Sequence, residues 1–296
     1  MTDLAEKFLN QCAWRMETPE LFGSFHIISS VLAVLMALLL AYCVRRSIRI
    51  YASADHEARH VRGCSDDPLA RRHLIRVLVA AGWVLILMEI FKQFFLYYIV
   101  NGGSYDWWYF PFQLCSVPMY LCVLLPFTKG KIQDAFLTFM AGYTLLSAAA
   151  ALVYPQDMLR SYTALTIHGF VWHGILIFIS FSILFCTDVS GYISYRRIFS
   201  VSGFLRATAL FVVLSVIAVS INAAAEPAMA AGGFVHKYAA MFYLNPYHLS
   251  PQPAVSNVQM TYGIPAGLML YELVIIAVSG IVILTEKILL HPSRNI

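Results

Sequence analysis

Seven long apolar stretches run through the 296-residue chain, and they constrain its fold more than any other feature. A helix needs about 20 apolar residues to cross the hydrocarbon core of a bilayer. Because lipid offers no hydrogen-bond partners, such continuous runs must fold as helices, whereas a membrane barrel would show alternating residues. We therefore predict an all-α polytopic membrane protein with seven transmembrane helices, at Ser24–Val44, Leu74–Val100, Tyr109–Phe127, Gln133–Val153, Thr163–Cys186, Ala207–Ala224 and Ile264–Leu284.

The composition agrees with a membrane protein and excludes several other classes. Hydrophobic residues make up 60% of the chain and charged residues only 12%, against about 25% charged residues in soluble domains. So few charges exclude a soluble enzyme, a disordered chain and a nucleic-acid binder. The six cysteines are unevenly spaced and do not form a small disulfide framework. With no internal repeat, residues 1–296 are expected to form a single seven-helix transmembrane domain.

The basic residues predict the orientation of the helices. Fifteen Lys and Arg residues fall in connections or in the C-terminal tail on one side of the bilayer, eight of them from Arg45 to Arg76. The opposite side carries only Lys7, Arg15, Arg160 and Lys237. Because the more basic side usually faces the cytoplasm, we expect an external N-terminus and a cytoplasmic C-terminus.

The third expected helix carries a cysteine close to its outer end. Pro111 fits the first helical turn, and Cys115 then lies about 6 Å below the outer edge, near the depth of phospholipid ester bonds. Pro118 cannot donate to the carbonyl of Leu114, so a kink and a free acceptor are expected beside Cys115. A buried cysteine often serves only as a small apolar residue, so Cys115 is either a chemical group or part of the packing.

Two histidines lie towards the outer end of the fifth expected helix. His168 and His173 are five residues apart, so they point about 140° apart around the helix and do not form a metal pair on one face. Both lie on the same side of the bilayer as Cys115. A neutral imidazole beside a thiol can take its proton and leave a thiolate nucleophile. The alternative is that both rings are hydrogen-bonded packing residues.

The second expected helix holds two charged residues, which hydrocarbon rarely contains. Glu89 and Lys92 are three residues apart, so they can form an ion pair on one helix face. The pair either fixes helix packing or, with His26 and Asn222, forms the polar site of a transporter or small-ligand binding protein. Few other ionisable residues lie within the spans and no repeat of discontinuous helices is visible, which counts against the transporter.

The connection Ala225–Gly263 is the longest on the outer side. It contains His236, Tyr247, His248 and three closely spaced prolines, which predict ordered turns rather than a helix. A connection of this length often acts as a lid or a binding element. A metal-dependent hydrolase would have to gather three ligands from His168, His173, His236 and His248, and the sequence has no metal-binding motif.

Several short motifs follow one another in a recognisable order. Phe25-His26 in the first span and Glu89-x-x-Lys92 in the second precede Pro111-Phe-Gln-Leu-Cys115 and His168-Gly-x-x-Trp-His173-Gly. Asn222, Asn245-Pro-Tyr and Pro265 come after them. This series resembles the YwaF-type bacterial integral membrane proteins and their animal relative, transmembrane protein 164. The likeness covers most of the chain, from Phe22 to Leu284.

The resemblance implies a function. The animal member is understood as a lipid acyltransferase that works through a cysteine and a histidine, and Cys115 matches the position of the nucleophile. His173 is the matching histidine by its motif, and His168 is the alternative. Such an enzyme would move a fatty acyl chain between phospholipid and lysophospholipid through an acyl-thioester. With water as the acceptor, it would be a lipid hydrolase.

We also predict the surroundings of this reaction from the polar residues of the sequence. Glu89, Lys92, Asn222 and Tyr247 are the expected substrate-binding residues, and Lys92, Asn222 or Tyr247 would donate hydrogen bonds to the oxyanion. The expected partners are membrane phospholipids and lysophospholipids, with no cofactor, no metal and no nucleic acid. The bacterial cytoplasmic membrane is the expected location.

Overall fold

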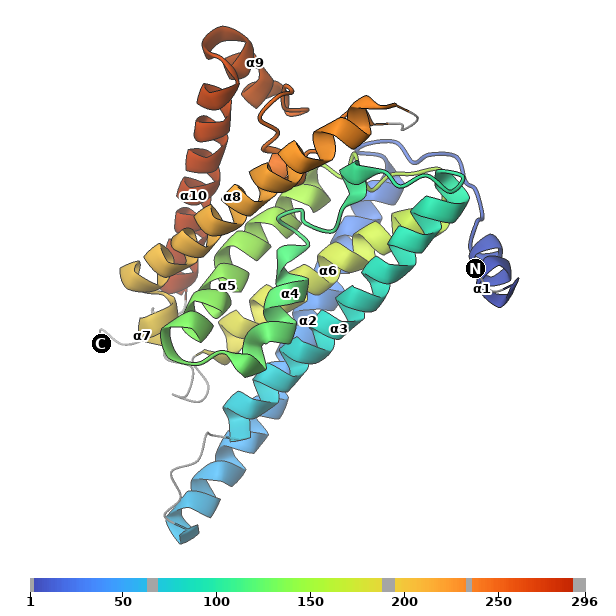
Figure 1. Ribbon diagram of the computed structural model, residues 1–296. Helices are drawn as coiled ribbons and strands as arrows, with labels where there is room; N and C mark the ends of the chain where they lie inside the picture. The colour runs from blue at the N-terminus through green and yellow to red at the C-terminus, as the bar shows by residue number, and fades with distance from the viewer. Residues whose placement is uncertain (1–2, 63–68, 188–194, 233–235, 290–296) are drawn as a thin grey trace.

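The computed structural model describes residues 3–62, 69–187, 195–232 and 236–289, and this part of the chain is built from helices without a β-sheet (Figure 1). Six helices are long and apolar enough to cross a membrane. They confirm an all-α, multi-pass membrane protein. These helices are α2 (Ser24–Arg62), α3 (Leu69–Phe95), α5 (Gly130–Val153), α6 (Thr163–Cys186), α8 (Val201–Ala230) and α10 (Ile264–Leu289).

Shorter elements connect the long helices. Most of them lie at the end of the bundle where α6 and α10 begin, which we call the upper end because it is uppermost in Figure 1. The α-helical ones are α1 (Asp3–Gln11), α4 (Val117–Leu124), α7 (Tyr195–Ile198) and α9 (Pro253–Tyr262). A π-helical turn, η1 (Leu96–Val100), extends α3, and the 3-10 turns are η2 (Trp107–Tyr109), η3 (Leu125–Phe127) and η4 (Met241–Tyr243).

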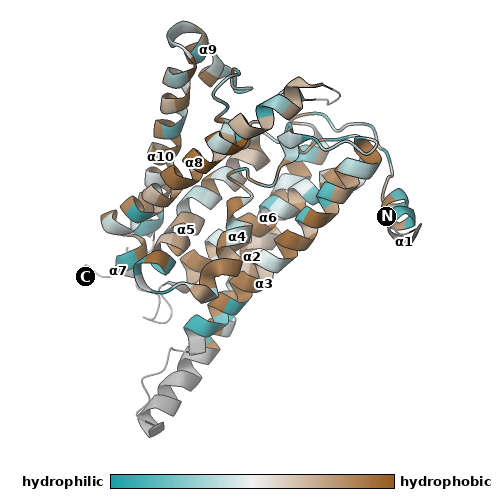
Figure 2. Ribbon diagram, viewed as in Figure 1, coloured by the Kyte–Doolittle hydropathy of each residue, from teal (hydrophilic) through white to brown (hydrophobic). Residues whose placement is uncertain are grey.

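The centre of the bundle is formed by α5 and α6. More than half of the residues in their apolar windows are buried, whereas α2, α8 and α10 each bury less than a quarter. These outer helices are nevertheless apolar, and Figure 2 shows the hydrophobic colour over much of α8 and α10. A helix that is hydrophobic all round and exposed on one side requires an apolar solvent. The bundle therefore presents its outer helices to lipid.

The third predicted helix, Tyr109–Phe127, is much shorter in the structure. Only Val117–Leu124 is α-helical, and the residues from Phe110 to Ser116 form irregular turns. Pro118 occupies the first turn of α4, where its missing N–H costs nothing, so it starts this helix rather than kinking a longer one. The expectation of a helical Cys115 was wrong. The chain still passes from the upper end of α3 to the lower end of α5 through this segment (Figure 1).

Two connections are more helical than the sequence indicated. The Asp, His, Arg, Pro and Gly residues of Ser47–Arg72 favour a polar loop with at most a short surface helix, but α2 continues as a helix to Arg62. In the connection Ala225–Gly263, α8 continues to Ala230 and a further helix, α9, follows the proline cluster. Pro253 lies in the first turn of α9, so the last proline of the cluster begins a helix.

A stack of aromatic rings links the centre of the bundle to the segment that carries Cys115. Phe139 and Tyr143 of α5 stack on each other, and Tyr143 stacks on Phe211 of α8. The stack continues to Phe242 of η4 and ends on Phe112, three residues before Cys115. Ring pairs of this kind contribute about 0.5–1.5 kcal/mol each beyond their buried area.

Two side-chain amides hold η4 against the bundle. Asn222 of α8 accepts from the backbone N–H of Met241 (2.7 Å) and donates to its carbonyl (3.0 Å). Gln113 accepts from the N–H of Phe242 (3.0 Å) and donates to the carbonyl of Ala240 (3.1 Å). Phe242 and Tyr243 have φ values of 55° and 59°, a conformation that such residues adopt only when their surroundings enforce it. We call Asn222 and Gln113 the amide clamp.

Close packing of α3 against α4 depends on a glycine. A Cβ atom at Gly82 would lie 2.7 Å from the Cβ of Cys122 and 3.3 Å from the carbonyl oxygen of Met119. Neither neighbour can move without shifting α4. The small residue therefore sets the distance between these two helices and supports the segment that precedes α4.

We expect Gly82→Ala to lower the free energy of unfolding by about 1–3 kcal/mol, because the added methyl group overpacks a rigid contact. Gly174→Ala is the matched control, since a Cβ there would meet Ala33 at an ordinary 3.5 Å. Unfolding can be followed in detergent by titration with a denaturing surfactant. Equal stability of the two variants would contradict the proposed α3–α4 packing.

We expect Asn222→Leu to lower the free energy of unfolding by about 2–4 kcal/mol, because it leaves the buried N–H and carbonyl of Met241 without partners. Ser220→Ala is the control on the same helix, because its exposed hydroxyl bonds only to the carbonyl of Val216. Limited proteolysis should also cut the 236–252 segment faster in Asn222→Leu. Unchanged stability and unchanged cleavage would show that the clamp does not hold η4.

Candidate functional site

Cys115 lies in a turn between η2 and α4 and is partly accessible. Its carbonyl accepts a hydrogen bond from the indole Nε1 of Trp172 in α6 (3.1 Å). The carbonyl of Pro111 accepts from the hydroxyl of Tyr120 (2.7 Å), and the N–H of Ser116 bonds to the carbonyl of Gln113 (2.7 Å). Side chains thus hold the backbone around Cys115 in a fixed, non-helical shape.

The predicted ion pair in α3 is present. The ammonium of Lys92 lies 2.8 Å from Oε2 of Glu89, which is buried. Gln93 donates to Oε1 of Glu89 (2.6 Å) and to the carbonyl of Tyr109 (2.6 Å). Glu89 is therefore contacted by both Lys92 and Gln93, and Gln93 ties the pair to the segment that leads to Cys115.

Lys92 connects the predicted catalytic residues. Its ammonium lies 5.9 Å from the centre of the Trp172 ring, within the range of a cation–π interaction. It also interacts electrostatically with the thiol of Cys115 and with both histidines. The structure thus brings Cys115, His168, His173 and Lys92 into one region between α3, α6 and the turn before α4.

His173 is buried and oriented by its own helix. Its Nδ1 donates to the carbonyl of Gly169 (2.8 Å), because a carbonyl can only accept. A neutral imidazole that donates from Nδ1 carries its lone pair on Nε2. Nε2 has no hydrogen-bond partner in the part of the chain that the structure describes. His173 therefore presents an unused acceptor at the far end of its ring.

His168 has the opposite arrangement. Its Nε2 donates to the carbonyl of Met88 in α3 (3.1 Å), and its ring stacks on Trp172. The lone pair is then on Nδ1, next to the histidine's own backbone. Neither histidine forms a hydrogen bond with the thiol of Cys115. The two rings thus differ in which nitrogen is free, and only His173 offers its distal nitrogen.

Two tyrosines that the sequence did not single out lie on the other side of Cys115. Tyr243 of η4 and Tyr271 of α10 both interact electrostatically with the thiol, and their rings contact each other edge to face. The hydroxyl of Tyr243 donates to Oδ2 of Asp157 (3.4 Å). Burial raises the pKa of Tyr243 well above its usual value, so this hydroxyl keeps its proton. The left-handed backbone at Tyr243 gave no recognisable sequence signal.

Other predicted residues lie apart from Cys115 or are already engaged. The Asn222 side chain is fully buried and both its amide atoms bond to Met241, so it is a structural residue. The side chain of Tyr247 is 58% exposed. His26 accepts from the N–H of Phe22 and donates to the carbonyl of Leu152, so both of its ring nitrogens are used.

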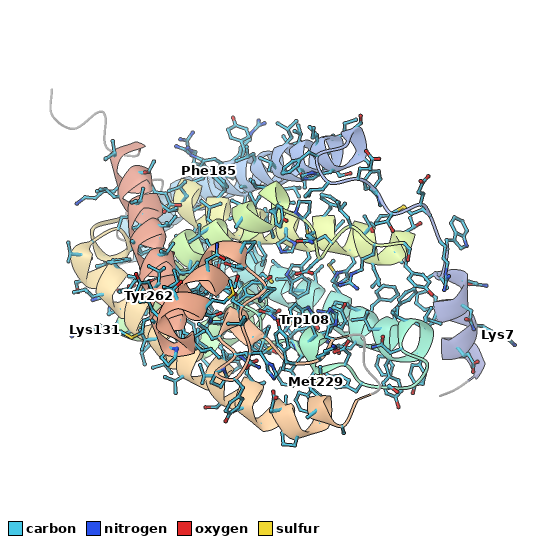
Figure 3. All side chains as sticks on the ribbon, turned by 90° about the horizontal axis from the view of Figure 1, so that it is seen from above. Lys7, Trp108, Lys131, Phe185, Met229 and Tyr262 are labelled. Carbon is cyan, nitrogen blue, oxygen red and sulfur yellow. The ribbon has the colours of Figure 1, made fainter. Side chains whose placement is uncertain are left out.

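Two histidine–carboxylate pairs fasten the upper segments over the bundle. His236 bonds to buried Asp106 (3.0 Å) and stacks on Trp108. His248 bonds to Glu226 of α8 (2.6 Å). In the view onto the upper end, Trp108 lies near the middle of these segments (Figure 3). Among the described residues, no three His, Cys, Asp or Glu side chains form a group that could hold a metal ion.

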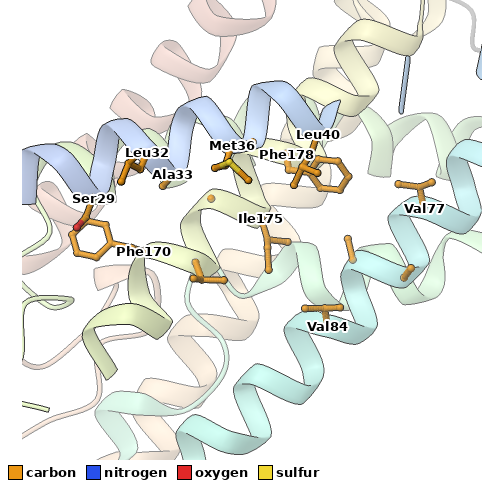
Figure 4. A pocket seen from close by; sticks show the side chains of 15 residues that line it. Ser29, Leu32, Ala33, Met36, Leu40, Val77, Val84, Phe170, Ile175 and Phe178 are labelled. Atoms are coloured by element: carbon orange, nitrogen blue, oxygen red, sulfur yellow. The ribbon is translucent and has the colours of Figure 1, made fainter. Parts of the chain in front are cut away.

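An apolar groove of about 680 Å³ lies between α2, α3 and α6 (Figure 4). Its lining includes Leu32, Met36, Val84 and Phe178, and Ser29 supplies its only polar side chain. None of the predicted catalytic residues lines it. The groove therefore offers no group for a reaction and is separate from the region around Cys115.

Comparison with known proteins identifies the family. A model described as the TMEM164 family matches residues 21–285, which is most of the chain. No curated protein and no solved structure matches. The chain therefore belongs to the TMEM164 family.

Proposed function

We propose that this member of the TMEM164 family is an integral membrane acyltransferase that moves a fatty acyl chain between phospholipid and lysophospholipid, with Cys115 as the nucleophile. The observation that supports this most is the surroundings of Cys115. Cys115 is a partly buried residue in a turn that is held by hydrogen bonds from other side chains. It shares one region with the ammonium of Lys92 and with a histidine whose distal nitrogen is free. Packing alone does not require such an arrangement.

In the first half of the reaction, Nε2 of His173 accepts the thiol proton of Cys115. The thiolate attacks the carbonyl carbon of a phospholipid ester and forms a tetrahedral intermediate. As the intermediate collapses, the ester C–O bond breaks and the leaving alkoxide takes the proton from the imidazolium. The products are a lysophospholipid and an acyl-thioester on Cys115.

In the second half, a lysophospholipid hydroxyl attacks the thioester while His173 accepts its proton. Collapse of this intermediate forms the new ester and returns the proton to the sulfur of Cys115. Water in place of the lysophospholipid would give a free fatty acid, which is the hydrolase outcome. No cofactor enters either half of the reaction.

Lys92 can donate to the oxyanion. Its ammonium interacts electrostatically with Cys115 from the α3 side and carries three N–H groups. Donors aimed at the developing negative charge commonly supply the largest part of such catalysis. We propose Lys92 for this role, because the donors of Asn222 and Tyr243 are already used and Tyr247 is exposed.

We also propose seven crossings, with the upper end of the bundle on the external side. The crossing that would be added to the six long helices is the third along the chain, Tyr109–Phe127, which lies between the upper end of α3 and the lower end of α5. The unequal distribution of Lys and Arg supports this orientation. In a bacterium, Cys115 would then lie towards the outer leaflet of the cytoplasmic membrane.

We expect Cys115→Ala to lower acyl transfer by about 10³-fold or more, because no thioester can form. Purified protein is incubated with labelled phospholipid, with and without lysophospholipid, and the hydroxylamine-sensitive label on the protein is measured. Cys122→Ala is the matched control, since this neighbouring thiol is fully buried against Met140 and should not matter.

Unchanged transfer in Cys115→Ala would refute the nucleophile. Release of free fatty acid regardless of added lysophospholipid would identify a hydrolase. Substrate flux into liposomes that survives Cys115→Ala but disappears in Glu89→Gln would instead support a transporter.

We expect His173→Asn to lower the rate of acylation by about 10²–10⁴-fold, because it removes the general base. The asparagine amide can still donate to the carbonyl of Gly169, so folding should be retained. His168→Gln can likewise still donate to the carbonyl of Met88 and should change the rate by less than about tenfold. Single-turnover labelling measures both variants, and the opposite ranking would make His168 the base.

A further inference from the structure

Arg160 lies in the connection between α5 and α6, at the upper end of the bundle. Its guanidinium covers the ring of Tyr109, with 4.8 Å from Cζ to the ring centre, and its Nε donates to the carbonyl of Asp157 (2.9 Å). The stacked ring and the carbonyl fix the direction of the guanidinium. Arginine held in this way presents its remaining donors in a rigid fork that fits a phosphate.

Arg160 forms no ion pair with a carboxylate of the described residues. In the part of the chain that the structure describes, no Asp or Glu oxygen lies within 4.0 Å of its guanidinium, whereas Lys92 is paired with Glu89. Its guanidinium also interacts with the hydroxyl of Tyr109, and because arginine carries five N–H donors, others remain available. A fixed, uncompensated arginine of this kind favours an anionic ligand.

Two contacts place Arg160 in the wall around Cys115. Arg160 stacks on the ring of Tyr109. The carbonyl of Tyr109 accepts a hydrogen bond from Gln93, which also bonds to Glu89 of the Glu89–Lys92 pair. Asp157, three residues before Arg160, accepts from Tyr243, which interacts with Cys115. Arg160 thus lies in the connection at the upper end of the bundle and shares neighbours with Cys115.

We propose that Arg160 binds the phosphate of a glycerophospholipid whose acyl ester lies at Cys115. This inference rests on the proposed function and adds the part of the substrate that is recognised. In a glycerophospholipid, the phosphate is separated from the acyl esters only by the glycerol carbons and lies on the aqueous side of them. An ester at the depth of Cys115 therefore brings the phosphate towards Arg160. The enzyme would select lipids that carry a phosphate over neutral glycerides.

The kinetic test compares two acyl donors with identical chains, a phospholipid and the phosphate-free diacylglycerol. We expect Arg160→Gln to raise KM for the phospholipid by about 10-fold to 100-fold, as for loss of a hydrogen-bonded charge pair, with kcat changed less than about threefold. KM for diacylglycerol should change little. Arg160→Lys should restore part of the affinity, because it keeps the charge without the fork.

Arg15→Gln is the matched control, because Arg15 also stacks on a tyrosine at this end, with 4.9 Å to the ring of Tyr162, and bonds to its hydroxyl. It should leave KM for both acyl donors unchanged. If Arg160→Gln raised KM equally for phospholipid and diacylglycerol, its role would be structural and the proposal would be overturned. An unchanged KM for both acyl donors would overturn it as well.

A binding test separates this proposal from the proposed reaction. Cys115→Ala protein is titrated with lysophospholipid and with inorganic phosphate. We expect the double variant Cys115→Ala, Arg160→Gln to bind lysophospholipid at least about tenfold more weakly than Cys115→Ala. Inorganic phosphate should bind to Cys115→Ala much more weakly than the lipid does. If lysophospholipid binding depends on Arg160 but the wild-type protein transfers no acyl group, the phosphate site is supported and the proposed acyl transfer is refuted. Inorganic phosphate binding as tightly as the lipid would overturn the lipid assignment.

Discussion

Backbone polar groups cannot be left unpaired in lipid, and the segment that carries Cys115 meets this requirement without being a helix. The carbonyls of Tyr109, Pro111 and Cys115 accept from the side chains of Gln93, Tyr120 and Trp172. Each unmet group in this setting would cost several kcal/mol, so these donors are a condition for the turn to exist. The rest of the site depends on them, because they decide where the thiol lies.

This arrangement explains why the cysteine can be a reactive group. A thiol within a helix of the bundle is packed among neighbouring helices. Cys122 is an example, since it is fully buried. Cys115 instead lies in a turn, partly accessible, while the aromatic stack and the amide clamp keep that turn rigid. Rigidity matters because catalytic groups must be held close to their productive geometry. The irregular backbone leaves Cys115 only partly buried, and the buried amides keep its position fixed.

Much of the fold and part of the site could be predicted from the sequence, and the remainder failed for definable reasons. Six of the expected spans appear as long helices because apolar length alone determines them. The Glu89–Lys92 pair followed from helical spacing. Pro118 was ambiguous, because a proline can either kink a helix or begin one. Here the hydrogen bonds that distant side chains make to the preceding turn decide that it begins a helix. Tyr243 could not be found because a left-handed backbone and a long-range contact leave no periodic pattern.

The polar residues that link Arg160 to Cys115 and His173 follow an order that matches a phospholipid. Arg160 and Asp157 lie in the connection before α6 begins, and Tyr243 links Asp157 to the region of Cys115. His173 follows further down α6, whose lower half is almost entirely apolar. A lipid presents phosphate, ester and hydrocarbon in the same order from the surface inwards. Within α6 the histidines thus stop in its upper half, which is the depth that the proposed reaction at an ester requires.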